Sequence, residues 1–209
     1  MVQDHDESTR HLVLVLGDQL DRESAAFDGF DRQADLVWMV EVRAEAEHVW
    51  ASKPHIAILL SCMRHFCDAL RTDGVRVDYR TLDDPENLGS LDAELLRAVE
   101  VWRPKRVIVV KPGEWRAQQL LCDAGQQAGA PLEIRQDRHF LCPPDVFEGH
   151  AEGRRQLVME HFYREMRRRT GVLMDGDTLV GGQWNYDPQN RRSLGREGPI
   201  VPAAATSSA

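Results

Sequence analysis

Short aliphatic runs that alternate with stretches of helical period are the feature that most constrains the fold of this chain. Residues 12–16 and 36–40 are unbroken apolar runs, which is typical of strands buried on both faces. Weaker strand patterns follow at 75–82, 107–110 and 132–135, and helical periods lie at 56–70, 91–102 and 115–128. Strands that alternate with helices indicate βαβ units. We therefore predict an α/β domain with a Rossmann-like, doubly wound, five-stranded parallel sheet.

The charge balance changes after residue 150. The whole chain of 209 residues has 26 basic and 34 acidic side chains, a net charge of −8, whereas residues 151–196 hold nine arginines and no lysine. An Arg-rich, helix-like stretch at 154–169 precedes a segment rich in turn-forming glycines. The parts that we expect are an α/β domain at 11–150, a helix and linker at 151–192 and a disordered tail at 193–209.

Composition and motifs exclude several classes of protein. A net acidic chain is a poor candidate for coating nucleic acid, and four cysteines are too few for a disulfide scaffold. The sequence contains no P-loop, no GxGxxG after the first strand and no HExxH or GxSxG motif. The start of the chain lacks the pattern of a signal peptide, and no apolar run could span a bilayer. We expect a cytoplasmic protein without a membrane partner.

The residues that follow the first two predicted strands form the candidate binding site. Gly17, Asp18 and Gln19 follow the first strand, whereas Glu41 ends the second and Glu45 comes shortly after. Ligands of open α/β sheets bind outside the carboxyl ends of the strands, so these side chains could contact ring nitrogens or hydroxyls. The alternative is that Asp18 caps a helix and that Glu41 and Glu45 are solvated acids, and spacing alone favours it.

Eight motifs occur in an order and spacing that resemble a known family. They are LVLGDQL at 14–20, MVEV with AEA at 39–46, SCMRHF at 61–66, VDY with LDDP at 77–85, PGEWR at 112–116, FL at 140–141, MEHFYREMRRRTG at 159–171 and GGQWNYD at 181–187. The series is similar to the N-terminal domain of the deoxyribodipyrimidine photolyase-related proteins, which are the bacterial iron–sulfur cryptochromes and (6–4) photolyases. The resemblance extends from about residue 12 to residue 192.

The resemblance implies that the strand-end crevice binds an antenna pigment, 6,7-dimethyl-8-ribityllumazine. Leu59 would pack against the pigment rings, although its apolar helix face is also compatible with a plain core position. Trp50 lies in a stretch that departs from the family pattern, and it would either stack on the pigment or block the pocket. The cofactor-binding residues that we expect are Gly17, Asp18, Gln19, Glu41, Glu45, Trp50 and Leu59.

The resemblance also implies which functions lie outside this sequence. The family's FAD and [4Fe-4S] cluster belong to a second, helical domain that repairs DNA, and residues 193–209 do not resemble its beginning. We therefore expect an antenna part of a photolyase or blue-light sensor that has no catalytic residue, holds no metal and reaches DNA only through a separately encoded FAD domain. The alternatives are an interaction module that docks such a domain through residues 159–170 and a truncated remnant without function.

Overall fold

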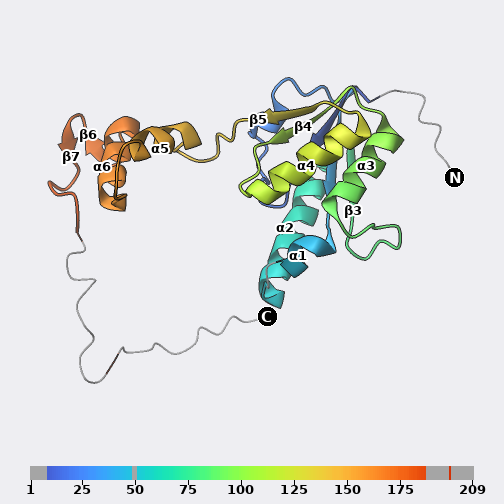
Figure 1. Ribbon diagram of the computed structural model, residues 1–209, viewed down its shortest axis with the longest axis horizontal. Helices are drawn as coiled ribbons and strands as arrows, with labels where there is room; N and C mark the ends of the chain where they lie inside the picture. The colour runs from blue at the N-terminus through green and yellow to red at the C-terminus, as the bar shows by residue number, and fades with distance from the viewer. Residues whose placement is uncertain (1–8, 49–50, 187–197, 199–209) are drawn as a thin grey trace. The chain divides into compact units, whose positions relative to one another are not determined.

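The computed structural model describes residues 9–48, 51–186 and 198 of the chain (Figure 1). The chain divides into two compact units, Met1–Pro143 and Pro144–Ala209. Of the tail expected at 193–209, only Gly198 is among the described residues. The two units are described one after the other.

The first unit contains the predicted five-stranded sheet, and every strand pair in it is parallel. The strand order is β3-β2-β1-β4-β5, which confirms the doubly wound, Rossmann-like topology. The strands are β1 (His11–Leu14), β2 (Leu36–Val40), β3 (Val77–Arg80), β4 (Arg106–Val110) and β5 (Leu132–Arg135). The third strand is shorter than its sequence pattern, which extended over 75–82.

Helices connect these strands where the apolar period predicts them. They are α2 (Lys53–Thr72), α3 (Leu91–Trp102) and α4 (Trp115–Ala128), together with the short η1 (Ala25–Phe27) and α1 (Arg43–His48). Helix α2 begins after Ser52, whose hydroxyl accepts a hydrogen bond from the His55 amide, and α4 ends at Gly129, whose φ is +66°. Among the described residues, no helix is both long enough and apolar enough to cross a bilayer.

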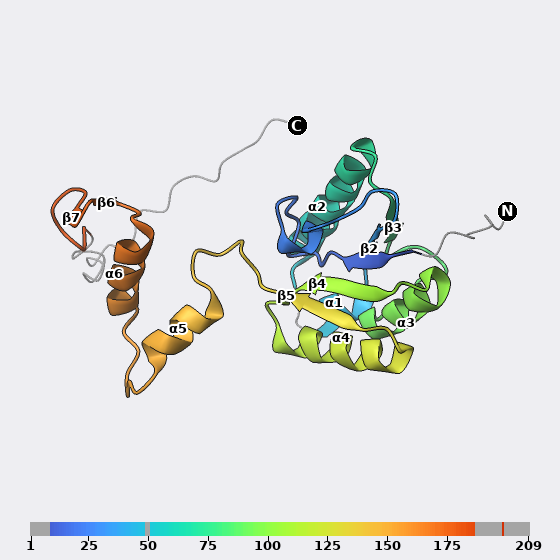
Figure 2. The same ribbon diagram turned by 90° about the horizontal axis from the view of Figure 1, so that it is seen from above.

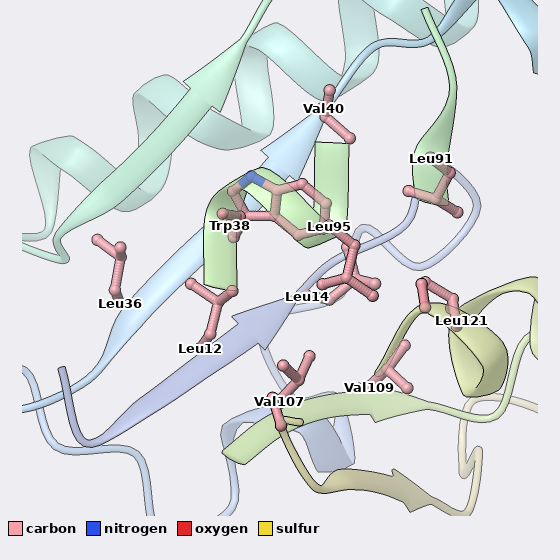
Figure 3. Packing of buried hydrophobic residues seen from close by; sticks show 13 residues of the cluster. Leu12, Leu14, Leu36, Trp38, Val40, Leu91, Leu95, Val107, Val109 and Leu121 are labelled. Atoms are coloured by element: carbon pink, nitrogen blue, oxygen red, sulfur yellow. The ribbon is translucent and has the colours of Figure 1, made fainter. Parts of the chain in front are cut away.

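Alternate residues of each strand face opposite layers of helices. Leu12 and Leu14 of β1 pack in a cluster with α3 and α4, whereas Val13 and Val15 pack in a cluster with α2 and η1. Figure 2 shows α2 on one side of the sheet and α3 and α4 on the other. In Figure 3, Trp38 lies among the leucines and valines of the first cluster and has only 1% of its surface exposed. Helices therefore cover both faces of the sheet, so a ligand can reach the sheet only at its edges.

The second unit contains two helices and a small hairpin. Its elements are α5 (Pro144–Ala151), α6 (Met159–Thr170), β6 (Met174–Asp175) and β7 (Thr178–Leu179). Helix α6 starts at Met159, later than the helical stretch predicted from 154. Nδ1 of the buried His150 of α5 lies 2.7 Å from a carboxylate oxygen of Glu165 of α6, and its ring packs against those of Phe147 and Phe162, which also contact each other. These contacts join α5 to α6, which both belong to the second compact unit. The sequence predicts a boundary after residue 150, which lies within α5.

Candidate functional site

A cavity lies at the point where the order of the strands reverses. Strands β1 and β4 are neighbours, but the chain leaves them in opposite directions across the sheet, so the loops that follow them diverge. The cavity has a volume of about 320 Å³. Its walls come from residues 17–24 after β1, from Leu59 and Cys62 of α2, from Val110 of β4, and from residues 137–140 after β5. We call it the strand-end cavity.

Four of the residues expected at the binding site line this cavity: Gly17, Asp18, Gln19 and Leu59. Asp18 and Leu59 are exposed, as suits groups that contact a ligand. The Gln19 side-chain amide donates hydrogen bonds to the carbonyls of Val110 and, less closely, Lys111, at 3.1 and 3.3 Å. This amide therefore ties the loop after β1 to the end of β4 and shapes the mouth of the cavity.

Gly17 lets the loop after β1 run close to α2. A β-carbon at this position would lie 2.9 Å from the sulfur of Met63 and 3.5 Å from Cδ1 of Leu59. Contacts of 2.9 Å are too short for a real β-carbon, so any side chain here would displace Met63. The glycine thus allows the loop after β1 to pack closely against α2, which forms one wall of the strand-end cavity.

Glu41 does not line the strand-end cavity. Its carboxylate is buried at the end of β2 and accepts two hydrogen bonds from the Arg64 guanidinium, at 2.7 and 2.9 Å. It also accepts a hydrogen bond from the Tyr79 hydroxyl and one from the Leu82 amide, the latter at 2.7 Å. We refer to these four residues as the Glu41 network. Four donors therefore engage its two oxygens within the protein.

The Glu41 network stabilises the ionised form of its carboxylate. Burial alone would raise the pKa of Glu41, but the hydrogen bonds from Arg64, Tyr79 and Leu82 outweigh it, and the pKa lies below its ordinary value of 4.5. Burial, followed by the hydrogen bond to Glu41, raises the pKa of Tyr79, so its hydroxyl stays a donor. The same carboxylate raises the pKa of Arg64. The network is therefore a charged, bidentate pair with a phenol beside it.

The end of β2 opens onto a different cavity. This second cavity has a volume of about 340 Å³ and is lined by Arg43, Ala44 and Glu47 of α1, by Leu82 and by residues 87–90. Glu45 belongs to α1, but its side chain is not described, and Trp50 lies outside the described residues. The prediction that these two residues bind a ligand thus stays a prediction.

Sequence reasoning missed the part of the cavity that follows β5. Asp137, His139 and Phe140 line the cavity, and Nδ1 of His139 lies 3.7 Å from an oxygen of Asp21, another lining residue. The fifth strand is the weakest pattern in the sequence, and the FL motif at 140–141 carries only the family resemblance, so neither predicts a binding wall here. The position of this strand directly before a cluster of polar and aromatic residues is the signal that could have identified this wall.

The lining of the strand-end cavity combines apolar surface with hydrogen-bonding groups. Leu59, Val110 and Phe140 provide apolar surface, and the carboxylates and the Ser24 hydroxyl provide polar partners. The four cysteines do not suit a [4Fe-4S] cluster, because they lie on α2, on α4 and after β5, and Cys67 is buried in the core. No group of three or more His, Cys, Asp or Glu in the described part of the chain could hold a metal ion.

The parallel sheet and the cavity at its switch point define a doubly wound α/β domain of the kind that binds ligands at its carboxyl edge. The family model of the deoxyribodipyrimidine photo-lyase-related proteins matches residues 13–208, and the chain belongs to this family. A (6-4) photolyase of Agrobacterium fabrum strain C58 is 46% identical over 181 residues, which cover 87% of this chain and 36% of that protein. The chain thus spans about a third of the length of this curated relative.

Proposed function

We propose that this chain is the antenna-pigment domain of a photolyase-related protein of light-dependent DNA repair or blue-light sensing. The pigment would be 6,7-dimethyl-8-ribityllumazine, bound in the strand-end cavity. The observation that carries the proposal is the convergence of Gly17, Asp18, Gln19 and Leu59 on one cavity at the switch point. When bound, the pigment would absorb light, and the residues of this chain would hold and orient it.

The size and lining of the strand-end cavity support a single fused ring system with a short polyol chain. Its volume of about 320 Å³ is at the low end of small-molecule sites, which begin near about 300 Å³. In the proposed arrangement Leu59 and Val110 contact the rings, the Asp18 carboxylate accepts hydrogen bonds from the pigment hydroxyls, and the Ser24 hydroxyl donates to or accepts from them. FAD, the [4Fe-4S] cluster and contact with DNA would belong to a separate helical domain.

The test is a titration of the purified chain with 6,7-dimethyl-8-ribityllumazine, followed by absorption and fluorescence. Leu59→Trp should abolish binding, because an indole at this position fills the cavity. Ile58→Trp is the matched control, since Ile58 is the neighbouring residue of α2, is 66% exposed and does not line the cavity. Asp18→Ala should weaken binding, and Asp123→Ala, at an exposed position of α4, should leave it unchanged. A wild-type chain that takes up no pigment would contradict the antenna function.

Exposed apolar residues of the second unit favour a second candidate function, the docking of the family's FAD domain. Met159 and Tyr163 are exposed on α6, and Tyr186 is exposed beside a hollow of about 570 Å³ that Tyr163, Leu173 and Val180 also line. Apolar surface gathered around such a hollow is typical of an interaction site. Among the arginines of α6, only the buried Arg167 lines the hollow.

The docking function can be tested with the part of the Agrobacterium photolyase that this chain does not match. That part, expressed separately, should co-elute with this chain in size-exclusion chromatography. Met159→Glu should prevent co-elution, whereas His161→Glu, which puts the same charge on another exposed position of α6, should not. Independent elution of the two wild-type proteins at micromolar concentration would argue against docking.

A further inference from the structure

Helix α2 carries both the wall of the strand-end cavity and the arginine that binds Glu41. Leu59 and Cys62 form the wall, and Arg64 follows within the next turn. The first ten residues of α2 contain no buried side chain, and the buried residues of this helix begin at Met63. Within the wall segment, Leu60 is only partly buried against the core, so the position of the wall also depends on the contacts that anchor the helix just beyond it.

Met63 and Arg64 contribute to anchoring α2 just beyond the wall, beside the partly buried Leu60 and Phe66, and their contacts differ in rigidity. Met63 packs against Gly17, but a thioether side chain is flexible and adapts to shifts of its neighbours. Arg64 instead makes two hydrogen bonds to the two oxygens of Glu41, which fix both the distance and the orientation of the helix. The Glu41 side chain is fully buried, and Tyr79 and Leu82 hold it from the side of β3. The rigid anchor of the cavity wall is thus the Glu41 network.

We propose that Glu41 is a positioning residue for the strand-end cavity, which acts through Arg64 to hold Leu59 and Cys62 at the distance that a ligand requires. The proposal rests on the proposed function for its ligand, but the mechanical link between Glu41 and α2 does not depend on which ligand binds. Glu41 contributes no contact to the ligand. Glu41 holds the wall in its binding conformation before the ligand arrives, so binding does not cost the free energy of ordering the wall.

The experiment combines Glu41→Gln with a matched control on the other face of the sheet. Gln keeps the shape of the side chain and one acceptor oxygen, which can serve either Tyr79 or the Leu82 amide, because these two donors use different oxygens of Glu41. It loses the charge that binds Arg64. Glu94→Gln is the control, because Glu94 is also fully buried, pairs with Arg97 and accepts a hydrogen bond from the Leu88 amide at 2.7 Å, but lies on α3. Both variants neutralise a buried, arginine-paired carboxylate, and Glu41→Gln alone releases α2.

The first readout is hydrogen exchange of backbone amides, which needs no ligand. In Glu41→Gln the amides of residues 57–63 should exchange about tenfold faster, while those around the buried Cys67 and Leu70 stay protected. Glu94→Gln should leave exchange in α2 unchanged. Arg64→Met removes the contact between Arg64 and Glu41 by changing Arg64, which is half exposed. It should therefore reproduce the faster exchange even where Glu41→Gln folds poorly. Arg64→Lys keeps the charge but not the bidentate contact and should be intermediate.

The second readout is the affinity for 6,7-dimethyl-8-ribityllumazine. Glu41→Gln and Arg64→Met should bind the pigment about tenfold more weakly than the wild type. The affinity of Arg64→Lys should lie between these variants and the wild type, and that of Glu94→Gln should equal the wild type. If the wild type fails to bind the pigment but exchange in α2 responds as expected, the antenna function is wrong and the positioning role of Glu41 stands. If exchange at residues 57–63 is the same in Glu41→Gln, Glu94→Gln and the wild type, the positioning role is wrong.

Discussion

The ends of β1 and β2 look alike in sequence but differ in the structure. Each strand runs out of an aliphatic stretch into short polar residues, yet Asp18 is exposed beside a cavity, whereas Glu41 is buried under four hydrogen bonds. β1 borders the switch point, where the next loop turns away. β2 lies beside β3, whose following residues close over it. A polar residue after a strand therefore becomes available to a ligand only where the topology leaves it uncovered.

The largest test of this comparison removes each carboxylate in turn. Glu41→Ala should lower the free energy of unfolding by about 3 kcal/mol, because Tyr79 and the Leu82 amide lose their buried acceptor. This loss of stability is at the low end for breaking a buried ion pair, because the half-exposed Arg64 guanidinium can be solvated when its partner is removed. Asp18→Ala should change it by less than about 0.5 kcal/mol. Urea denaturation measures both, and similar values for the two variants would contradict the contrast drawn here.

A change of pH should affect the Glu41 network without removing the side chain. Because the pKa of Glu41 is lower in the folded than in the unfolded chain, its contribution is complete above pH 4.5 and is lost as the pH falls through the folded value. The unfolding free energy should thus decrease on acidification, and less steeply in Glu41→Gln. Asp35, whose pKa is lowered because the Arg10 and backbone hydrogen bonds outweigh burial, should supply part of the remaining slope. Chemical denaturation at a series of pH values measures this slope.

The hydrogen bonds of Gln19 should have a smaller effect. Gln19→Met keeps the shape of the side chain but removes the donors to the carbonyls of Val110 and Lys111. We expect a loss of about 1 kcal/mol, as for a typical partly buried hydrogen bond. Thermal unfolding followed by circular dichroism measures it. An unchanged melting temperature would mean that water replaces this amide without cost.

The smallest effect separates two glycines of neighbouring loops. Gly17→Ala should cost about 0.5–1 kcal/mol, since Met63 must shift to admit the new methyl group. Gly113→Ala is the matched control, because its β-carbon would lie 3.7 Å from an oxygen of Asp18, an ordinary contact. Its cost should stay below about 0.5 kcal/mol. Equal costs for both variants would show that the approach of Gly17 to α2 is not tight.

Much of the fold could be predicted because it depends on local pattern. The five strands and the helices α2, α3 and α4 follow from apolar runs and period, which reflect burial on one or both faces. The helices α1 and α5 are too short for a period to stand out, and the two-residue strands β6 and β7 have no alternation to detect. Helix α6 begins later than predicted, because arginine-rich polar residues ahead of Met159 carry no period that sets a start.

The candidate site, too, could be predicted only in part from the sequence. Sequence determined that Gly17, Asp18 and Gln19 end a buried strand, and the order of its motifs pointed to the photolyase-related family. Only the tertiary structure decided that the Glu41 carboxylate is engaged in hydrogen bonds within the protein. Its partners are Arg64 on α2 and Tyr79 on β3, which lie far from it in the sequence. The tertiary structure also brought His139 into the cavity. The physical reason is that a side chain's availability depends on what covers it, and that follows from contacts distant in sequence.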